Sequence, residues 1–244
     1  MKTILKKELQ LFFLQPTLYI VSAFFITICS LFIWLFSSNY NIFNSGYASL
    51  NNFFEVAPWI LLFIVPALSM QLFAQEEFSG TLDWLLVQPI KISSIVKGKL
   101  IALFVFVLFI LLPTLFYVFT IYQLSVPKGA VDLAQIAVSY VGLFLISFAF
   151  CSIGLFSSSI TNNQVIAYLV GLVLNFIFLF GFTSLSSYEL LGSFDSFLQT
   201  LSFSYQYQSF LKGILDTRNL SFFVLITGLF YFLTVYNVKL KKLK

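Results

Sequence analysis

The sequence predicts an all-α membrane protein with six transmembrane helices, an N-terminal interfacial helix and a short cytoplasmic helix. Composition is the first reason: 60% of the 244 residues are hydrophobic and 9% are charged, whereas charged residues make up about a quarter of a soluble domain. The mean hydropathy of +0.99 agrees. The second reason is that apolar residues occur in runs of membrane-spanning length. The third is that basic residues gather between alternate runs.

Residues 1–15 are expected to form the interfacial helix. Apolar residues from Ile4 to Phe13 recur at the three- and four-residue spacing of an amphipathic helix, and lysines occupy the other side. Such a helix lies in the headgroup plane with its lysines toward phosphate. A basic segment that only sets topology is the alternative. The next apolar run is too long for a cleaved signal peptide and has no clear A-x-A site, so we expect a retained anchor.

Six apolar runs are expected to cross the membrane, because a helix needs about 20 apolar residues to span the hydrocarbon core. The runs cover residues 17–36, 56–74, 100–122, 133–157, 165–185 and 222–238. Pro16 suits the first turn of the first span, and Pro66 is expected to bend the second. Only the polar segment 157–164 separates the fourth and fifth runs, which predicts a tight helical hairpin. No flexible linker interrupts the chain, so residues 1–244 are expected to form one domain.

The basic residues predict the orientation. Ten of the thirteen lie in the N-terminal segment, in the loop between the second and third runs, or in the C-terminal segment. With six spans these three segments share one side of the membrane, and the positive-inside rule places that side in the cytoplasm. We therefore expect a multi-pass membrane protein with both termini in the cytoplasm.

Several residue types that catalysis and ion coupling need are absent from the sequence or from its predicted spans. There is no histidine, the commonest general base, and no G-x-x-x-x-G-K-[ST] phosphate loop. No span contains a charged residue of the kind that binds a coupling ion. Cys29 and Cys151 fall within apolar runs, which is typical of buried cysteines rather than of disulfides or metal ligands. We therefore expect a protein that is not an enzyme, binds no cofactor or nucleic acid itself, and takes its energy from another subunit.

The segment between the second and third spans combines an acidic start with a basic end. A short amphipathic helix is predicted at residues 76–89, because paired glutamates suit its positive end and the residue before Pro89 avoids the helical conformation. Its apolar face should carry Phe78, Leu82, Leu85 and Leu86. Its other face should carry Glu76, Gly80 and Asp83. We expect the apolar face to rest on the bundle and the acidic face to contact a partner.

Residues 186–221 form the longest loop expected on the opposite side of the membrane. The spacing of Phe197, Leu198, Leu201, Tyr205 and Gln208 predicts a re-entrant or surface helix, since aromatic residues favour the membrane interface. The loop could pack as a cap over the bundle, or it could serve as a gate or partner contact. The candidates for the second role are Tyr205, Tyr207, Lys212, Asp216 and Arg218.

The segment between the second and third spans also carries a recognisable motif. The pattern E-x-x-x-G-T-x-[DE]-x-L-L-x-x-P, followed by I-V-x-G-K, resembles the cytoplasmic signature of ABC-2 type transporter permeases. In this sequence it comprises Glu76, Gly80, Thr81, Asp83, Leu85, Leu86 and Pro89, then Ile95, Val96, Gly98 and Lys99. The six-span layout and the G-L-F-S-S-S-I-T-N-N-Q segment at residues 154–164 are also similar to that family. The resemblance covers essentially the whole chain.

This resemblance implies a transmembrane permease subunit that a separate ATP-binding subunit drives, with ATP and Mg²⁺ on that partner. It implies that the 76–89 helix is the coupling helix, whose ATPase contacts would be Glu76, Glu77, Gly80, Thr81, Asp83, Leu85, Leu86 and Pro89. A second cytoplasmic contact would involve Ser158, Thr161, Asn162 and Asn163. The permease would pair with a second membrane subunit, either a copy of itself or a companion.

Residues 209–223 match a narrower pattern, S-x-x-x-G-x-[IL]-D-x-R-[DN]-x-x-[YF]-F. This pattern is similar to the gliding motility-associated permease subfamily, GldF. The implied partners are then a GldA-like ATPase and a GldG-like companion subunit, and the implied location is the inner (cytoplasmic) membrane of a bacterium. Tyr207 stands where that subfamily is expected to have a histidine. The alternative function is a membrane scaffold of a motility or secretion apparatus without transport of its own.

Overall fold

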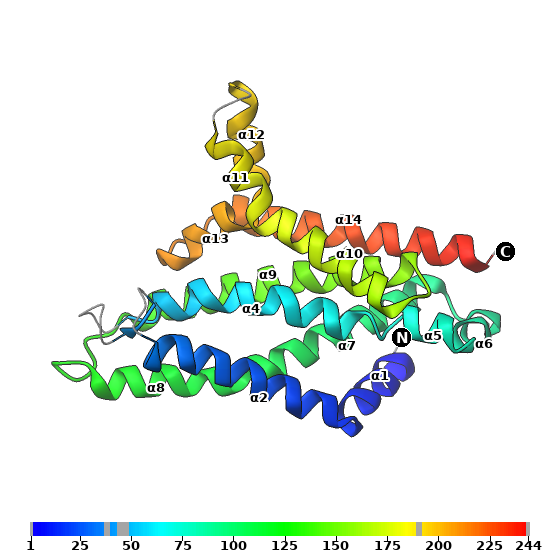
Figure 1. Cartoon of the computed structure of the whole chain (residues 1–244), viewed down its shortest axis with the longest axis horizontal. Coiled ribbons are helices and arrows are strands. Elements are labelled where there is room, and N and C mark those ends of the chain that lie inside the picture. The colour runs from blue at the N-terminus through cyan, green and yellow to red at the C-terminus, as the bar shows by residue number, and fades with distance from the viewer. Residues whose placement is uncertain (1, 37–39, 43–48, 189–191, 243–244) are drawn as a thin grey trace.

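The computed structural model describes residues 2–36, 40–42, 49–188 and 192–242, and all regular elements among them are helices. Most of the long helices run side by side along one axis (Figure 1). Five are long and apolar enough to cross a membrane, and a pair bent by 68° makes a sixth if it counts as one span. The prediction of an all-α membrane protein is confirmed. Met1 of the predicted interfacial helix and residues 189–191 of the predicted outer loop lie outside the described residues.

The bent pair is formed by the first elements of the chain. α1 covers Lys2–Leu14, α2 covers Pro16–Ser30, and α2 continues into a π-helical turn, η1, at Leu31–Leu35. Pro16 occupies the first turn of α2, as expected of a residue without an N–H group. α1 buries Ile4, Glu8 and Phe12 against the start of α7. α1 therefore lies across one end of the bundle while α2 runs along it.

Two spans and a short connection follow. The elements are α4 (Asn51–Ser69), α5 (Ala74–Phe78), α6 (Thr81–Val87), α7 (Ile92–Leu111), the 3₁₀ turn η2 (Leu112–Thr114) and α8 (Leu115–Leu124). The second predicted span thus begins five residues earlier than position 56, and the third begins well before position 100. Pro113 lies in η2, where the helix changes to a tighter turn because a proline cannot donate to the helical ladder.

The central helix is α9, Leu133–Ile160, which packs against α4, α7, α10, α13 and α14. Asp132 caps it: one carboxylate oxygen accepts from the N–H groups of Ala134 and Gln135, each at 3.0 Å. Two glycines allow neighbours to approach closely. A Cβ atom at Gly142 would lie 2.6 Å from the Cβ of Phe210, and one at Gly154 would lie 2.5 Å from the hydroxyl of Ser69.

The last third of the chain contains α10 (Gln164–Phe176), the π-helical turn η3 (Ile177–Gly181), α11 (Phe182–Ser187), α12 (Ser193–Leu201), α13 (Phe203–Leu211) and α14 (Thr217–Lys242). α11 and α12 lie against each other and project sideways from the bundle (Figure 1). The single helix predicted from Phe197 to Gln208 is wrong, because the chain breaks at Ser202 into α12 and α13. α13 packs on α9.

The glycines of α9 generate a prediction about stability. Replacing Gly142 with Ala forces the added methyl group against Phe210 of α13, and such overpacking costs about 1–3 kcal/mol. We expect a lower midpoint of thermal unfolding for the detergent-solubilised protein. Gly228→Ala in α14 is the matched control, because a Cβ there has nothing within 4 Å. Equal midpoints for the two variants would show that α13 does not pack on α9 in this way.

Candidate functional site

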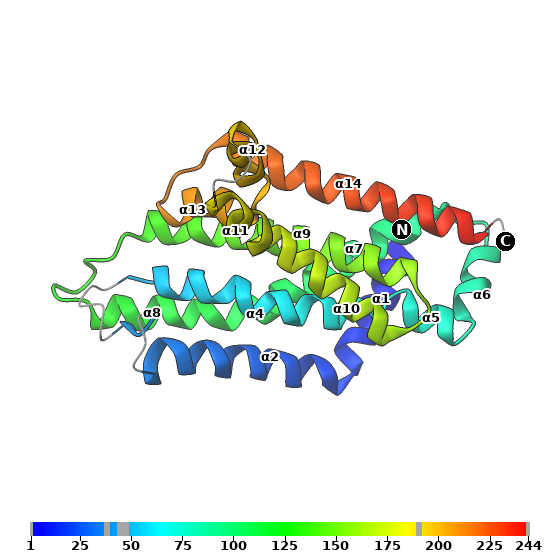
Figure 2. The ribbon, with the colours of Figure 1, turned by 45° about the horizontal axis from the view of Figure 1, so that its top comes forward.

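The connection between α4 and α7 consists of two helices, α5 and α6, at the end of the bundle that also carries α1 and the last turn of α14. We call this the basal end; Figure 2 shows α6 standing clear of the spans there. One helix was expected over residues 76–89. The structure divides it at Gly80, whose φ of +70° is left-handed and breaks the helical ladder. A Cβ at Gly80 would meet no atom within 4 Å, so the backbone conformation alone favours glycine.

The break rotates the two helices relative to each other and changes which residues face the bundle. Leu82 and Leu86 are buried as expected, and Leu85 is half-buried. Phe78 was expected on the same face but is 79% exposed. That expectation is wrong because it assumed an unbroken helical spacing across Gly80.

α6 presents an exposed surface that the sequence alone did not single out. Trp84 is 81% exposed and Val87 is 85% exposed. Asp83, one of the predicted contacts, lies beside them and is exposed, as are Thr81 and Pro89. We call Thr81, Asp83, Trp84 and Val87 the α6 surface. The spacing of Leu82 and Leu86 could have predicted this exposure. In a separate helix with these two leucines buried, Trp84 and Val87 lie on the opposite side.

Glu76 faces inward rather than toward a partner. One oxygen of its carboxylate lies 2.9 Å from the ammonium of Lys99, and the other lies 3.2 Å from the ammonium of Lys7. The Lys99 side chain is completely buried and also contacts a carboxylate oxygen of Glu8 at 2.9 Å and the carbonyl oxygen of Leu72 at 2.8 Å. We call Glu8, Glu76 and Lys99 the buried ion cluster.

Glu77 is also held within the chain. Its carboxylate pairs with the ammonium of Lys241 in the last turns of α14. The two adjacent glutamates therefore attach α5 to both ends of the chain: Glu76 to α1 and α7, and Glu77 to α14. This arrangement fixes α5, so α6 is the part of the connection that projects from the bundle.

The residues of the predicted second cytoplasmic contact also differ in exposure: Ser158 is internal, whereas Asn162 and Asn163 are exposed. Ser158 of α9 is buried, and its hydroxyl accepts from the N–H groups of Phe73 and Ala74 at 3.1 and 3.0 Å and donates to the Met70 carbonyl at 3.3 Å. It therefore stabilises the turn between α4 and α5. Among the other predicted contacts, Thr161 and Asn163 form local hydrogen bonds and Asn162 is exposed. The side-chain oxygen of Asn163 caps α10 by accepting from the N–H of Val165 at 2.9 Å.

The predicted outer residues are separated by the structure. Tyr207 is buried, and its hydroxyl donates to the carbonyl oxygen of Phe54 at 3.0 Å. This carbonyl lies four residues before Pro58, which has no N–H group to pair with it. Burial raises the pKa of the Tyr207 hydroxyl well above its usual value, so the hydroxyl keeps the proton that it donates. Tyr207 therefore has a structural role in holding α13 to α4.

The remaining outer candidates do lie together. Tyr205, Lys212, Asp216 and Arg218 line a depression of about 470 Å³ between α13 and the start of α14. The side chain of Asp216 accepts from the N–H of Arg218 at 2.9 Å and so stabilises the first turn of α14. This depression combines one acidic and two basic side chains with several amides.

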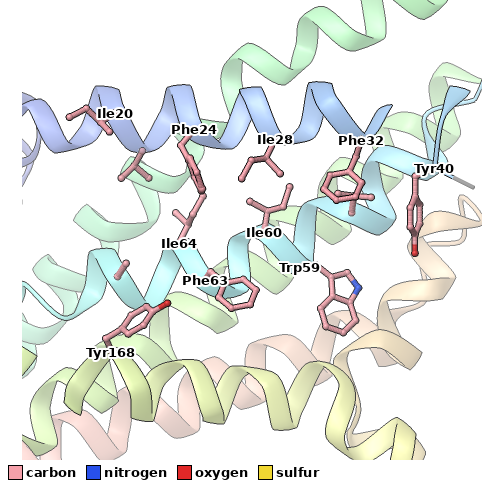
Figure 3. Close-up of a pocket in the computed structure, with 13 residues that line it drawn as sticks. Ile20, Phe24, Ile28, Phe32, Tyr40, Trp59, Ile60, Phe63, Ile64 and Tyr168 are labelled. Atoms are coloured by element: carbon pink, nitrogen blue, oxygen red, sulfur yellow. The ribbon is translucent and has the colours of Figure 1, made fainter. Parts of the chain in front are cut away.

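A second feature lies within the spans and was not predicted. A groove of about 730 Å³ runs between α2 and α4 and extends to Tyr168 of α10 (Figure 3). Ile28 of α2 and Ile60 of α4 face each other in it, whereas Trp59 and Phe63 lie on the side toward α10. Apolar side chains form nearly all of its wall. Sequence reasoning missed the groove because every face of these spans is apolar, so no pattern marks where two helices separate.

Within the described residues, no three His, Cys, Asp or Glu side chains come together as a metal site would require. Cys29 and Cys151 are buried free thiols in that part of the chain.

Comparison with known protein families identifies the family of this chain. A family model described as an ABC-2 family transporter protein matches residues 2–238. A search of curated proteins finds no match to the chain. Members of the matched family are membrane permease components and not enzymes, and a partner subunit hydrolyses the ATP. Because the match spans nearly all of the 244 residues, the chain belongs to the ABC-2 family of transporter membrane proteins.

Proposed function

We propose that this permease receives its driving force through the α6 surface, on which a separate ATP-binding subunit docks. The observation that carries the proposal is the exposure of Trp84 and Val87 beside Asp83 at the basal end. Exposed apolar groups rimmed by polar ones mark interaction sites, and a central aromatic side chain commonly supplies much of the binding energy. ATP and Mg²⁺ bind the partner, and this chain holds neither.

The way α6 is attached supports transmission of force. α5 is held by Glu76 and Glu77 to the ends of α1, α7 and α14. Ser158 fixes the turn that joins α5 to α4. A displacement of α6 therefore moves a body that is attached to several spans rather than a free loop. Among the predicted ATPase contacts, this proposal keeps Gly80, Thr81, Asp83 and Pro89 and adds Trp84 and Val87. It assigns the other four to internal contacts: Glu76, Glu77, Leu85 and Leu86.

We place the basal end in the cytoplasm of a bacterium and the spans in its inner membrane. The support is that nine of the twelve basic residues that the structure describes lie in α1, at the start of α7 or in the last turns of α14, and the positive-inside rule assigns such a basic side to the cytoplasm. A second membrane subunit, either a copy of this chain or a companion, completes the permease.

The process that we propose for this transporter is gliding motility. The support is the pattern at residues 209–223, which is similar to the GldF subfamily, and the partners would then be a GldA-like ATPase and a GldG-like companion. Two residues of the pattern have local structural roles: Gly213 adopts a φ of +77° between α13 and α14, and Asp216 stabilises the first turn of α14. The pattern therefore supports a shared backbone structure between α13 and α14 in this subfamily, and it does not identify the substrate.

The α6 surface generates a prediction about partner binding. Trp84→Ala removes the aromatic side chain of α6. Loss of such an anchor costs about 2 kcal/mol or more of binding free energy, which corresponds to about a 30-fold higher Kd. We expect this rise when binding of the purified ATPase to the solubilised permease is titrated. Asp83→Lys should weaken binding in the same assay. Tyr188→Ala, an aromatic side chain that is 70% exposed at the end of α11, is the control. Unchanged binding by both α6 variants would refute the docking site.

A second prediction separates transport from the scaffold alternative. A partner ATPase that binds ATP without hydrolysing it should assemble with the permease but abolish gliding of the cells. The measurements are co-purification of the complex and the speed of cells on a surface. Normal gliding with the inactive ATPase would favour a scaffold, because a scaffold needs assembly alone.

A further inference from the structure

The I-V-x-G-K motif lies on the first turns of α7, where Ile95, Val96, Gly98 and Lys99 are all buried. None of them reaches the α6 surface. Gly98 and Lys99 instead meet α1, which is the first element of the chain. The motif therefore describes how the basal end is assembled from segments that are distant in sequence.

Gly98 is the point at which α1 comes closest to α7. A Cβ at Gly98 would lie 3.0 Å from Cγ2 and 3.3 Å from Cβ of Ile4. A residue with a Cβ would require the Ile4 side chain to shift by a few tenths of an ångström. The next residue, Lys99, then reaches Glu8, which lies one helical turn after Ile4 on the same face of α1.

Lys99 joins three segments through one ammonium group. It contacts Glu8 of α1, Glu76 of α5 and the Leu72 carbonyl between α4 and α5, and it lies 5.2 Å from the ring centre of Phe73. Removing one member of a buried ion pair is strongly unfavourable, because it leaves an uncompensated charge. The cluster therefore favours movement of α1, α5 and the start of α7 as one body.

We propose that Glu8 and Lys99 are positioning residues that make α1 part of the coupling apparatus, so that displacement of α6 is transmitted to α2. This inference rests on the proposed function, because the displacement comes from the docked ATPase. α1 joins α2 directly at Gln15, through the 68° bend. α2 forms one wall of the groove in Figure 3 and α4 forms the other. Movement of α1 thus changes the position of one wall of the groove.

The test begins with Glu8→Leu. This substitution removes the contact between α1 and Lys99 but leaves Glu76 to neutralise the ammonium. The α6 surface is unchanged, so we expect the ATPase to bind with its normal Kd. We expect the permease-dependent ATP hydrolysis of the complex in lipid vesicles to fall by about fivefold or more, the range of a typical coupling between sites. Lys6→Gln, an exposed residue of the same helix, is the control and should hydrolyse ATP normally.

A disulfide distinguishes positioning from damage to the fold. The 3.3 Å between the Cβ positions of residues 4 and 98 is close to the roughly 3.5–4.5 Å of a disulfide. Ile4→Cys and Gly98→Cys in the Glu8→Leu background should therefore cross-link α1 to α7. Oxidation should restore hydrolysis and reduction should remove it again in the same sample. Each single cysteine variant, treated identically, controls for oxidation of Cys29 and Cys151.

The outcomes are separable. Normal hydrolysis by Glu8→Leu, or a disulfide that forms fully without restoring hydrolysis, would overturn the positioning role of Glu8 and Lys99 while leaving ATPase docking intact. Failure of the ATPase to bind the unmodified permease would overturn the proposed function and this inference together. Loss of hydrolysis with reversible restoration by the disulfide supports both.

Discussion

The basal end of this permease depends on the burial of a single ammonium group. Lys99 is inaccessible to solvent, and an isolated charge in that position would carry a desolvation cost of several kcal/mol. Two carboxylates and a backbone carbonyl surround it instead. These groups come from α1, α5 and the turn before α5. The contacts that stabilise the Lys99 ammonium therefore also determine how these three segments meet. The position of α6 follows, since α5 leads directly into it.

Several polar side chains that the sequence offers as functional candidates instead form hydrogen bonds to backbone groups that would otherwise be unpaired. Lipid offers no hydrogen-bond partner, so each carbonyl or N–H group that a bend or proline releases needs one within the protein. Tyr207 supplies a donor to the carbonyl that Pro58 leaves unpaired in α4. Ser158 accepts from two N–H groups where α4 gives way to α5. These residues support the shape of the spans, whereas the α6 surface and the depression between α13 and α14 are accessible.

Much of the fold could be predicted because it follows from local composition. Runs of apolar residues long enough to cross the hydrocarbon core gave the spans, and the glutamate pair and Pro89 gave the limits of the basal connection. The site was harder to predict. The inward orientation of Glu76 depends on Lys99 and Glu8, and Glu8 is 91 residues from Lys99 in the chain, so no window of sequence contains the cluster. The exposure of Phe78 depends on the left-handed backbone at Gly80, which helical periodicity does not register.

The sequence separation within the buried ion cluster also has a consequence for biogenesis. Proteins are synthesised from the N-terminus, so Glu8 emerges from the ribosome long before Glu76 and Lys99 exist. During that interval α1 has no counterion in α7 and no packing surface at Gly98. Its docking must therefore wait until the second and third spans have been made. α1 thus precedes α5 and α7 in synthesis but can dock at the basal end only after both have been made.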